Sequence, residues 1–244
     1  MRTEELIKAI SALSGDNEKF EEMKKGLPLG MDVSGNIMLA QKREKPLTIR
    51  NTCVTGAGKT NFIRRLIITI SCLYDKEDAC FFILSPRVEY GDLLRLHSAD
   101  VTVPYIRDKQ DLAQALETLK ELIHMRAFGK GYPHLFLVLD GLDELEGSNV
   151  NSDLAEYREI FDMIMRKPDI NVICGADLAR SIFSGYPGAF LGVGNCLITT
   201  REDGKADVTY VNDDSGLTLP APMTYPSEPS VTESIIFLNS LPNG

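Results

Sequence analysis

An α/β fold with a largely parallel sheet flanked by helices is predicted for this 244-residue chain by three observations. Near-continuous hydrophobic runs of strand length alternate with longer segments of helical periodicity, which is typical of strands buried on both faces of a sheet. The composition, 43% hydrophobic and 25% charged, is that of a folded chain rather than a disordered one. The length suits one large domain with short appendages.

The elements of this fold are expected in the following chain order. Apolar residues at helical spacing, interrupted at residues 15–17, predict a short amphipathic helical arm over residues 1–25. Two extended pieces around residues 34–36 predict a β-hairpin. Alternating elements then follow: strand 47–54, helix 59–74, strand 79–84, helix 111–125, strand 135–139, helix 157–164 and strand 170–174.

The C-terminal part of the chain has a different pattern. Residues 196–200 and 206–211 flank the turn signal Asp203-Gly204 and predict an antiparallel hairpin. Four prolines between Pro220 and Pro229 predict a stiff connector, and the sequence from Ser230 to Glu233 is a capping box that opens a short final helix. We therefore expect three parts: a helical arm, a main domain, and a proline-rich connector with a short helix. Their ranges are 1–25, 26–219 and 220–244.

Charge and cysteine content restrict the function classes. The formal net charge of -9 excludes a broad basic surface for nucleic acid. A local basic strip is still compatible with this net charge. The five cysteines are an odd number, lack paired metal-ligand spacing and lie mostly in apolar runs, which favours a reducing, cytoplasmic compartment. The N-terminus is charged, and the longest uncharged stretch, 181–200, is rich in glycine and polar residues. We expect no export signal and no direct membrane insertion.

A phosphate-binding loop is predicted at residues 53–60, between an expected strand and an expected helix. Glycine lets backbone amides surround phosphate oxygens, the helix N-terminus adds partial positive charge, Lys59 neutralises the outer phosphates, and the Thr60 hydroxyl is suited to Mg²⁺. Cys53 departs from the usual pattern, which has glycine at that position. The alternative is a glycine-containing turn with an exposed lysine. The expected nucleotide-binding residues are Cys53, Val54, Thr55, Gly56, Ala57, Gly58, Lys59, Thr60 and Asn61.

An acidic partner for this loop is expected at Asp140, which ends the hydrophobic run 135–139. Asp140 and Thr60 are therefore the candidate Mg²⁺ ligands. Related hydrolytic sites carry a glutamate next to this aspartate, but residue 141 is Gly. Asp143 and Glu144 follow and are the candidate catalytic carboxylates, with a solvated loop as the alternative. We expect slow hydrolysis, faster in a Gly141→Glu variant.

These motifs, in this order, resemble the FtsK/SpoIIIE motor domain. The resemblance rests on Leu-Gly-Met-Asp-x-x-Gly at 29–35, the 55–60 loop, Ser-Pro-Arg at 85–87, the 140–145 segment, Gly-Val-Gly-Asn-Cys-Leu at 192–197 and the final Pro-Ser-x-x-Glu helix. It covers about residues 26 to 241. It departs at Gly141, at Ser85-Pro86-Arg87, where the family has Asp-Pro-Lys, and at Ala176-Asp177, where it has Thr-Gln.

The resemblance implies a RecA-like P-loop NTPase domain that uses ATP and Mg²⁺ and assembles with itself into a hexameric ring. The cargo implied is double-stranded DNA or, as in the related type VII secretion ATPases, a protein substrate. A second reading is a non-catalytic protein-interaction module whose nucleotide site is structural. Attachment to a membrane complex through a partner stays open in both readings.

Several other polar residues have both a functional and an ordinary interpretation. Arg166 and Arg180 are the candidates for arginine fingers acting on a neighbouring subunit. Arg64-Arg65 is interpreted as an exposed cationic helix face, with a phosphate or subunit contact as the alternative. The three histidines, His97, His124 and His134, are unclustered and are interpreted as ordinary surface or packed residues rather than metal ligands.

Overall fold

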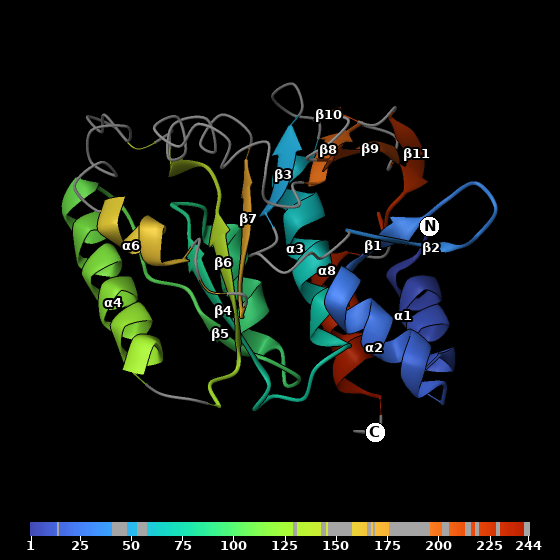
Figure 1. The fold of residues 1–244 in the computed structure, drawn as a ribbon, viewed down its shortest axis with the longest axis horizontal. Coiled ribbons are helices and arrows are strands. Elements are labelled where there is room, and N and C mark those ends of the chain that lie inside the picture. Colours follow the sequence, from blue (N-terminus) through green and yellow to red (C-terminus); the bar gives the residue numbers. More distant parts are fainter. Residues whose placement is uncertain are drawn as a thin grey trace.

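A computed structural model shows helices on both faces of one continuous sheet (Figure 1). The structure describes residues 1–13, 15–40, 48–52, 58–128, 131–142, 145, 158–164, 167, 169–175, 196–201, 205–212, 216–217, 220–227 and 230–241.

The central part of the sheet is parallel, as predicted. Its strands lie in the order β8-β3-β7-β6-β4-β5, and each neighbouring pair in this order is parallel. The bounds are β3 Thr48–Thr52, β4 Ala79–Leu84, β5 Asp100–Thr102, β6 His134–Leu139, β7 Ile170–Gly175 and β8 Cys196–Thr200. Because these strands are parallel, their carboxyl ends lie at one edge of the sheet, where ligand sites of open α/β sheets are found.

Alternate side chains of the central strands fill two separate cores. Phe81 and Ile83 of β4 pack in a core with α1 (Thr3–Ala12), α3 (Lys59–Ser71) and α8 (Val231–Asn239). Phe82 and Leu84 pack on the other face, with α4 (Lys109–Phe128) and α6 (Arg158–Ile164). Figure 1 shows these two helical layers on opposite sides of the sheet. A strand covered on both faces must be apolar throughout, which explains the continuous hydrophobic runs.

The N-terminal segment forms two helices with a break where the sequence predicts one. They are α1 and α2 (Asn17–Gly26). Asp16 caps α2, because its Oδ1 accepts a hydrogen bond from the backbone N–H of Lys19 at 3.3 Å. Leu6, Ile7 and Ile10 are buried, so α1 contributes directly to the core beside α3. The division into an arm and a main domain stays a prediction.

Antiparallel strands extend the sheet beyond β8. The order continues β8-β9-β11-β1-β2, with β10 paired to β9. The bounds are β1 Pro28–Met31, β2 Ile37–Leu39, β9 Lys205–Asn212, β10 Gly216–Leu217 and β11 Ala221–Thr224. Both predicted hairpins are confirmed, because β1 pairs with β2 and β8 with β9 in antiparallel register.

The proline-rich stretch contains a strand that the sequence analysis misses. β11 pairs along its length with β9, and Pro222 lies opposite Asp207. Its pairing with β1 is confined to Met31 and Thr224. At Pro222 the strand is therefore paired on one side, and a proline without an N–H is tolerated there. The predicted capping box of α8 is confirmed: the Glu233 N–H donates to Ser230 Oγ at 3.3 Å, and the Ser230 N–H donates to Glu233 Oε2 at 2.9 Å.

Candidate functional site

Two of the predicted site residues, Thr60 and Asp140, meet at the carboxyl edge of the sheet. Thr60 is the second residue of α3, and Asp140 directly follows β6. The Thr60 hydroxyl donates to Asp140 Oδ2 at 2.7 Å, across 80 positions of sequence. Asp140 is only 3% exposed, and burial of a carboxylate is costly unless it accepts such hydrogen bonds. The two candidate Mg²⁺ ligands are therefore adjacent.

The N-terminus of α3 is built as the predicted loop requires at the positions that the structure describes. Gly58 precedes the helix with φ +80°, a left-handed conformation that favours glycine. Lys59 is the first helical residue, followed by Thr60 and Asn61. The remaining predicted nucleotide-binding residues, Cys53, Val54, Thr55, Gly56 and Ala57, lie outside the described residues.

A tyrosine that the sequence analysis did not single out contacts the same carboxylate oxygen. Tyr90 lies in η1, a 3-10 helix over Val88–Arg95, and its hydroxyl donates to Asp140 Oδ2 at 2.9 Å. The side chain is fully buried. Burial, together with the negative charge of Asp140 and the hydrogen bond to it, raises the pKa of Tyr90 well above its ordinary value. Tyr90 is therefore a neutral hydrogen-bond donor at physiological pH.

Arg87 forms an ion pair with Asp140. Its Nε lies 3.6 Å from Asp140 Oδ2, and its backbone N–H donates to Ser85 Oγ at 3.2 Å. The ends of β4 and β6 are adjacent, since the Asp140 N–H donates to the Leu84 carbonyl at 3.2 Å. The sequence contains a signal for this contact, because Ser85-Pro86-Arg87 follows β4 as Asp140 follows β6. This signal predicts a contact only once β4 and β6 are known to be neighbouring strands.

Gly141 leaves the space that Arg87 uses. Gly141 has φ +68°, and a Cβ placed there would lie 2.7 Å from Arg87 Nε. A side chain at this position would therefore be strained in its backbone and would displace the arginine. The expected rise in turnover of a Gly141→Glu variant stays a prediction. On this geometry the glutamate and Arg87 would compete for one space.

The oxygen donors at this edge fit Mg²⁺ bound together with nucleotide. Mg²⁺ prefers oxygen ligands and is usually held by one or two carboxylates plus phosphate oxygens. Thr60 and Asp140 supply a hydroxyl and a carboxylate of this kind. Within the part of the chain that the structure describes, no three His, Cys, Asp or Glu side chains cluster to hold a metal without nucleotide. Thr60 and Asp140 would supply part of a Mg²⁺ coordination shell, which phosphate oxygens would complete.

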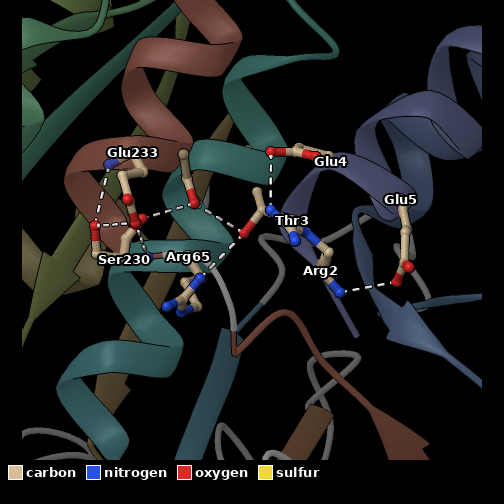
Figure 2. Close-up of polar contacts among 8 residues, drawn as sticks. Arg2, Thr3, Glu4, Glu5, Arg65, Ser230 and Glu233 are labelled. Atoms are coloured by element: carbon tan, nitrogen blue, oxygen red, sulfur yellow. Dashed lines mark hydrogen bonds and ion pairs between the residues drawn. The ribbon is translucent and has the colours of Figure 1, made fainter.

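The interpretation of Arg64-Arg65 as an exposed cationic face is wrong. Arg65 is 3% exposed: it donates to Thr3 Oγ1 at 3.1 Å, to the Ser227 carbonyl at 2.8 Å and to Asn61 Oδ1 at 3.3 Å. Figure 2 shows Arg65 and Thr3 facing each other between α3 and α1. Arg64 pairs with Asp92 of η1 at 2.8 Å. A buried guanidinium is stable only with such partners. Arg65 therefore connects α3 to Thr3 in α1 and to Ser227 in the C-terminal part of the chain.

The remaining candidates lie outside the described residues or away from the site. Asp143, Glu144, Arg166, Arg180 and Asp177 are not described by the structure, and their roles stay predictions. His134 begins β6, at the opposite edge from Asp140, with its ring 5.4 Å from that of Tyr74.

The solved structures that share this fold include the following three. The cytoplasmic domain of the Thermomonospora curvata type VII secretion ATPase EccC aligns with a TM-score of 0.56 and 13% identity, over 89% of this chain and 31% of that protein. A protein described as an ATPase aligns with a TM-score of 0.56 and 11% identity, over 87% of this chain and 94% of its own. The cytoplasmic domain of EssC aligns with a TM-score of 0.53 and 12% identity, over 88% of this chain and 49% of its own.

The chain shares the fold of these ATPase structures. The expected resemblance to FtsK/SpoIIIE-type ATPases is confirmed at the level of the fold, through EccC and EssC. This ATPase-like domain spans about a third of the matched EccC structure and about half of the EssC structure. No family model and no curated protein matches the sequence. Among the described residues, none of the helices is long and apolar enough to cross a membrane.

Proposed function

We propose that this chain is an FtsK/SpoIIIE-like domain that binds MgATP and hydrolyses it slowly. The observation that carries the proposal is the 2.7 Å hydrogen bond from Thr60 to the buried Asp140 at the carboxyl edge of the parallel sheet. It joins the end of a Gly-Lys-Thr motif to an aspartate that follows a central strand, which is the arrangement P-loop NTPases use for nucleotide and metal.

Each residue of the site has a role in this proposal. Lys59 and the N-terminus of α3 would attract the phosphates, and backbone amides of the predicted loop would surround them. Thr60 and Asp140 would hold Mg²⁺, which when bound neutralises phosphate charge. Tyr90 fixes the carboxylate of Asp140 by its hydrogen bond. Asn61, bonded to Arg65, is held beside the phosphate-binding turn.

Hydrolysis is proposed to be slow because the residue that follows Asp140 in the sequence is not a carboxylate. Residue 141 is Gly, and Arg87 occupies the adjacent space. A positioned general base contributes about 10² to 10⁴ in rate. Glu144, with Asp143 as the second candidate, would supply the water-orienting carboxylate from the segment after Asp140.

Measured ATP turnover in two matched variants tests the catalytic part. Glu144→Gln should abolish residual turnover while ATP binding is preserved, and Asp143→Asn should leave more activity because it is the second candidate. Rapid wild-type turnover that neither variant changes would show that the catalytic carboxylate lies elsewhere.

A second candidate function is a non-catalytic protein-interaction module with a structural nucleotide site. The Gly141–Arg87 arrangement favours it, since it removes the usual water-activating position. The fold shared with type VII secretion ATPases favours a protein partner, and self-association into a ring belongs to the same proposal. Cytoplasmic localisation, with membrane attachment only through a partner, is part of this proposal as well.

Turnover measured with and without double-stranded DNA separates the readings. We expect no stimulation, because the chain carries a net charge of -9 and has little counterion release to exploit. Stimulation by DNA would indicate a translocase. ATP binding without any turnover would support the interaction module.

A further inference from the structure

The carboxylate of Asp140 already has a cation and two hydroxyl donors of its own. Thr60 and Tyr90 donate to Oδ2 at 2.7 and 2.9 Å, and the Nε of Arg87 lies 3.6 Å from the same oxygen. The Asp140 side chain is 4% exposed and that of Arg87 is 29% exposed, so water reaches this ion pair mainly from the side of Arg87. Its negative charge is therefore largely compensated by groups of the protein.

Three local features accompany the contact between Arg87 and Asp140. Pro86 precedes Arg87 at the end of β4, the Arg87 N–H is bonded to Ser85, and Gly141 presents no side chain where the guanidinium lies. The left-handed conformation of Gly141 excludes most other residues from that position. Arg87 therefore contacts Asp140 through the space that Gly141 leaves, with 29% of its own side chain exposed.

A guanidinium here has two consequences for a nucleotide site. It repels a second cation from the carboxylate that would otherwise attract Mg²⁺, because like charges at close range disfavour each other. It also cancels the repulsion that a bare buried carboxylate would exert on phosphates. The first effect weakens binding of the magnesium complex, and the second strengthens binding of free ATP.

We propose that Arg87 is a resident cation of the nucleotide site, which takes over part of the charge compensation of Mg²⁺ and makes ATP binding nearly independent of divalent cation. This inference rests on the proposed ATP binding. It assigns Arg87 a positioning and charge-compensating role that is separate from the role of Lys59.

The test compares the affinity of a fluorescent, non-hydrolysable ATP analogue in excess MgCl₂ and in EDTA. For the wild type we expect the two dissociation constants to agree within about threefold. In Arg87→Gln, which removes the charge but keeps a side chain of similar reach, the ratio should rise to about tenfold or more, with tighter binding in Mg²⁺ and weaker binding in EDTA.

Two control variants isolate the charge of Arg87. Arg87→Lys keeps a cation and should keep a low ratio. Arg107→Ala removes an exposed arginine that pairs with Asp111 at 2.9 Å, and should behave as the wild type. A wild-type ratio of about tenfold or more, or a ratio that Arg87→Gln leaves unchanged, would overturn the proposal.

A measurement without nucleotide keeps this inference distinguishable from the proposed function. Mn²⁺ binding followed by electron paramagnetic resonance should be weak in the wild type, increase in Arg87→Gln, and be lost again when Asp140→Asn is added. If no variant binds nucleotide but Mn²⁺ shows this pattern, the proposed function fails and the role of Arg87 in ATP binding fails with it, while the repulsion of cations from Asp140 by Arg87 stands. If nucleotide binds and neither readout responds to Arg87, the role of Arg87 fails and the function stands.

Discussion

Gly141 is the position at which a single methyl group gives the sharpest stability test. Its φ of +68° costs an alanine about 1–2 kcal/mol relative to glycine. The new Cβ would lie 2.7 Å from Arg87 Nε, so the arginine must shift and its ion pair with Asp140 is weakened, at a further cost of about 1 kcal/mol. We therefore expect Gly141→Ala to lower the free energy of unfolding by about 2–3 kcal/mol.

Urea denaturation followed by circular dichroism measures this loss. Gly35→Ala is the matched control, because Gly35 has φ +83° but nothing lies within 4 Å of its Cβ position. It should show the backbone cost alone. In an Arg87→Ala background the contact with the arginine is absent. There, Gly141→Ala should lower the free energy of unfolding only as much as Gly35→Ala does in the wild type. Equal losses for Gly141→Ala and Gly35→Ala in the wild-type background would refute the Arg87 contact.

Two further predictions concern buried polar groups. Arg65→Met should lower the free energy of unfolding by about 2–4 kcal/mol, because it removes the hydrogen bonds of a buried guanidinium to Thr3 and Ser227. Arg64→Met on the same helix should cost about 1 kcal/mol, and similar losses of the two variants in urea denaturation would contradict the burial argument. The raised pKa of Tyr90 means that the folded state keeps a proton that the unfolded state releases above pH about 10, so stability is lost as pH rises past that value. Melting temperatures measured from pH 8 to 11 should fall less steeply in Tyr90→Phe, and identical slopes would show that Tyr90 does not contribute.

Local sequence signals predict much of the sheet and part of the site. The strand at 79–84 is found with its predicted bounds, because a strand covered on both faces is apolar at every position. The pairing of Thr60 with Asp140 follows from a loop motif and a strand-ending aspartate, once both strands belong to one parallel sheet.

Other features depend on contacts between remote segments and carry little local signal. Tyr90 lies in a 3-10 helix, whose short period does not stand out in the sequence, and its role depends on β4 being the neighbour of β6. The burial of Arg65 depends on Thr3 and Ser227, which are far away in sequence. The strand at 221–224 is hidden by Pro222, which is tolerated because β1 pairs with β11 only at its far end.

Calorimetric titration of MgATP into the wild type and Lys59→Ala tests the central claim most directly. Lys59 begins α3, directly before the threonine that contacts Asp140, so its removal takes the cation from the outer phosphates. Lys120→Ala is the control, since Lys120 lies on α4 beside Glu117. The account predicts one MgATP bound per chain, an affinity reduced by about tenfold or more in Lys59→Ala, and no change in Lys120→Ala. Absence of binding by the wild type, or equal affinity in Lys59→Ala, would contradict it.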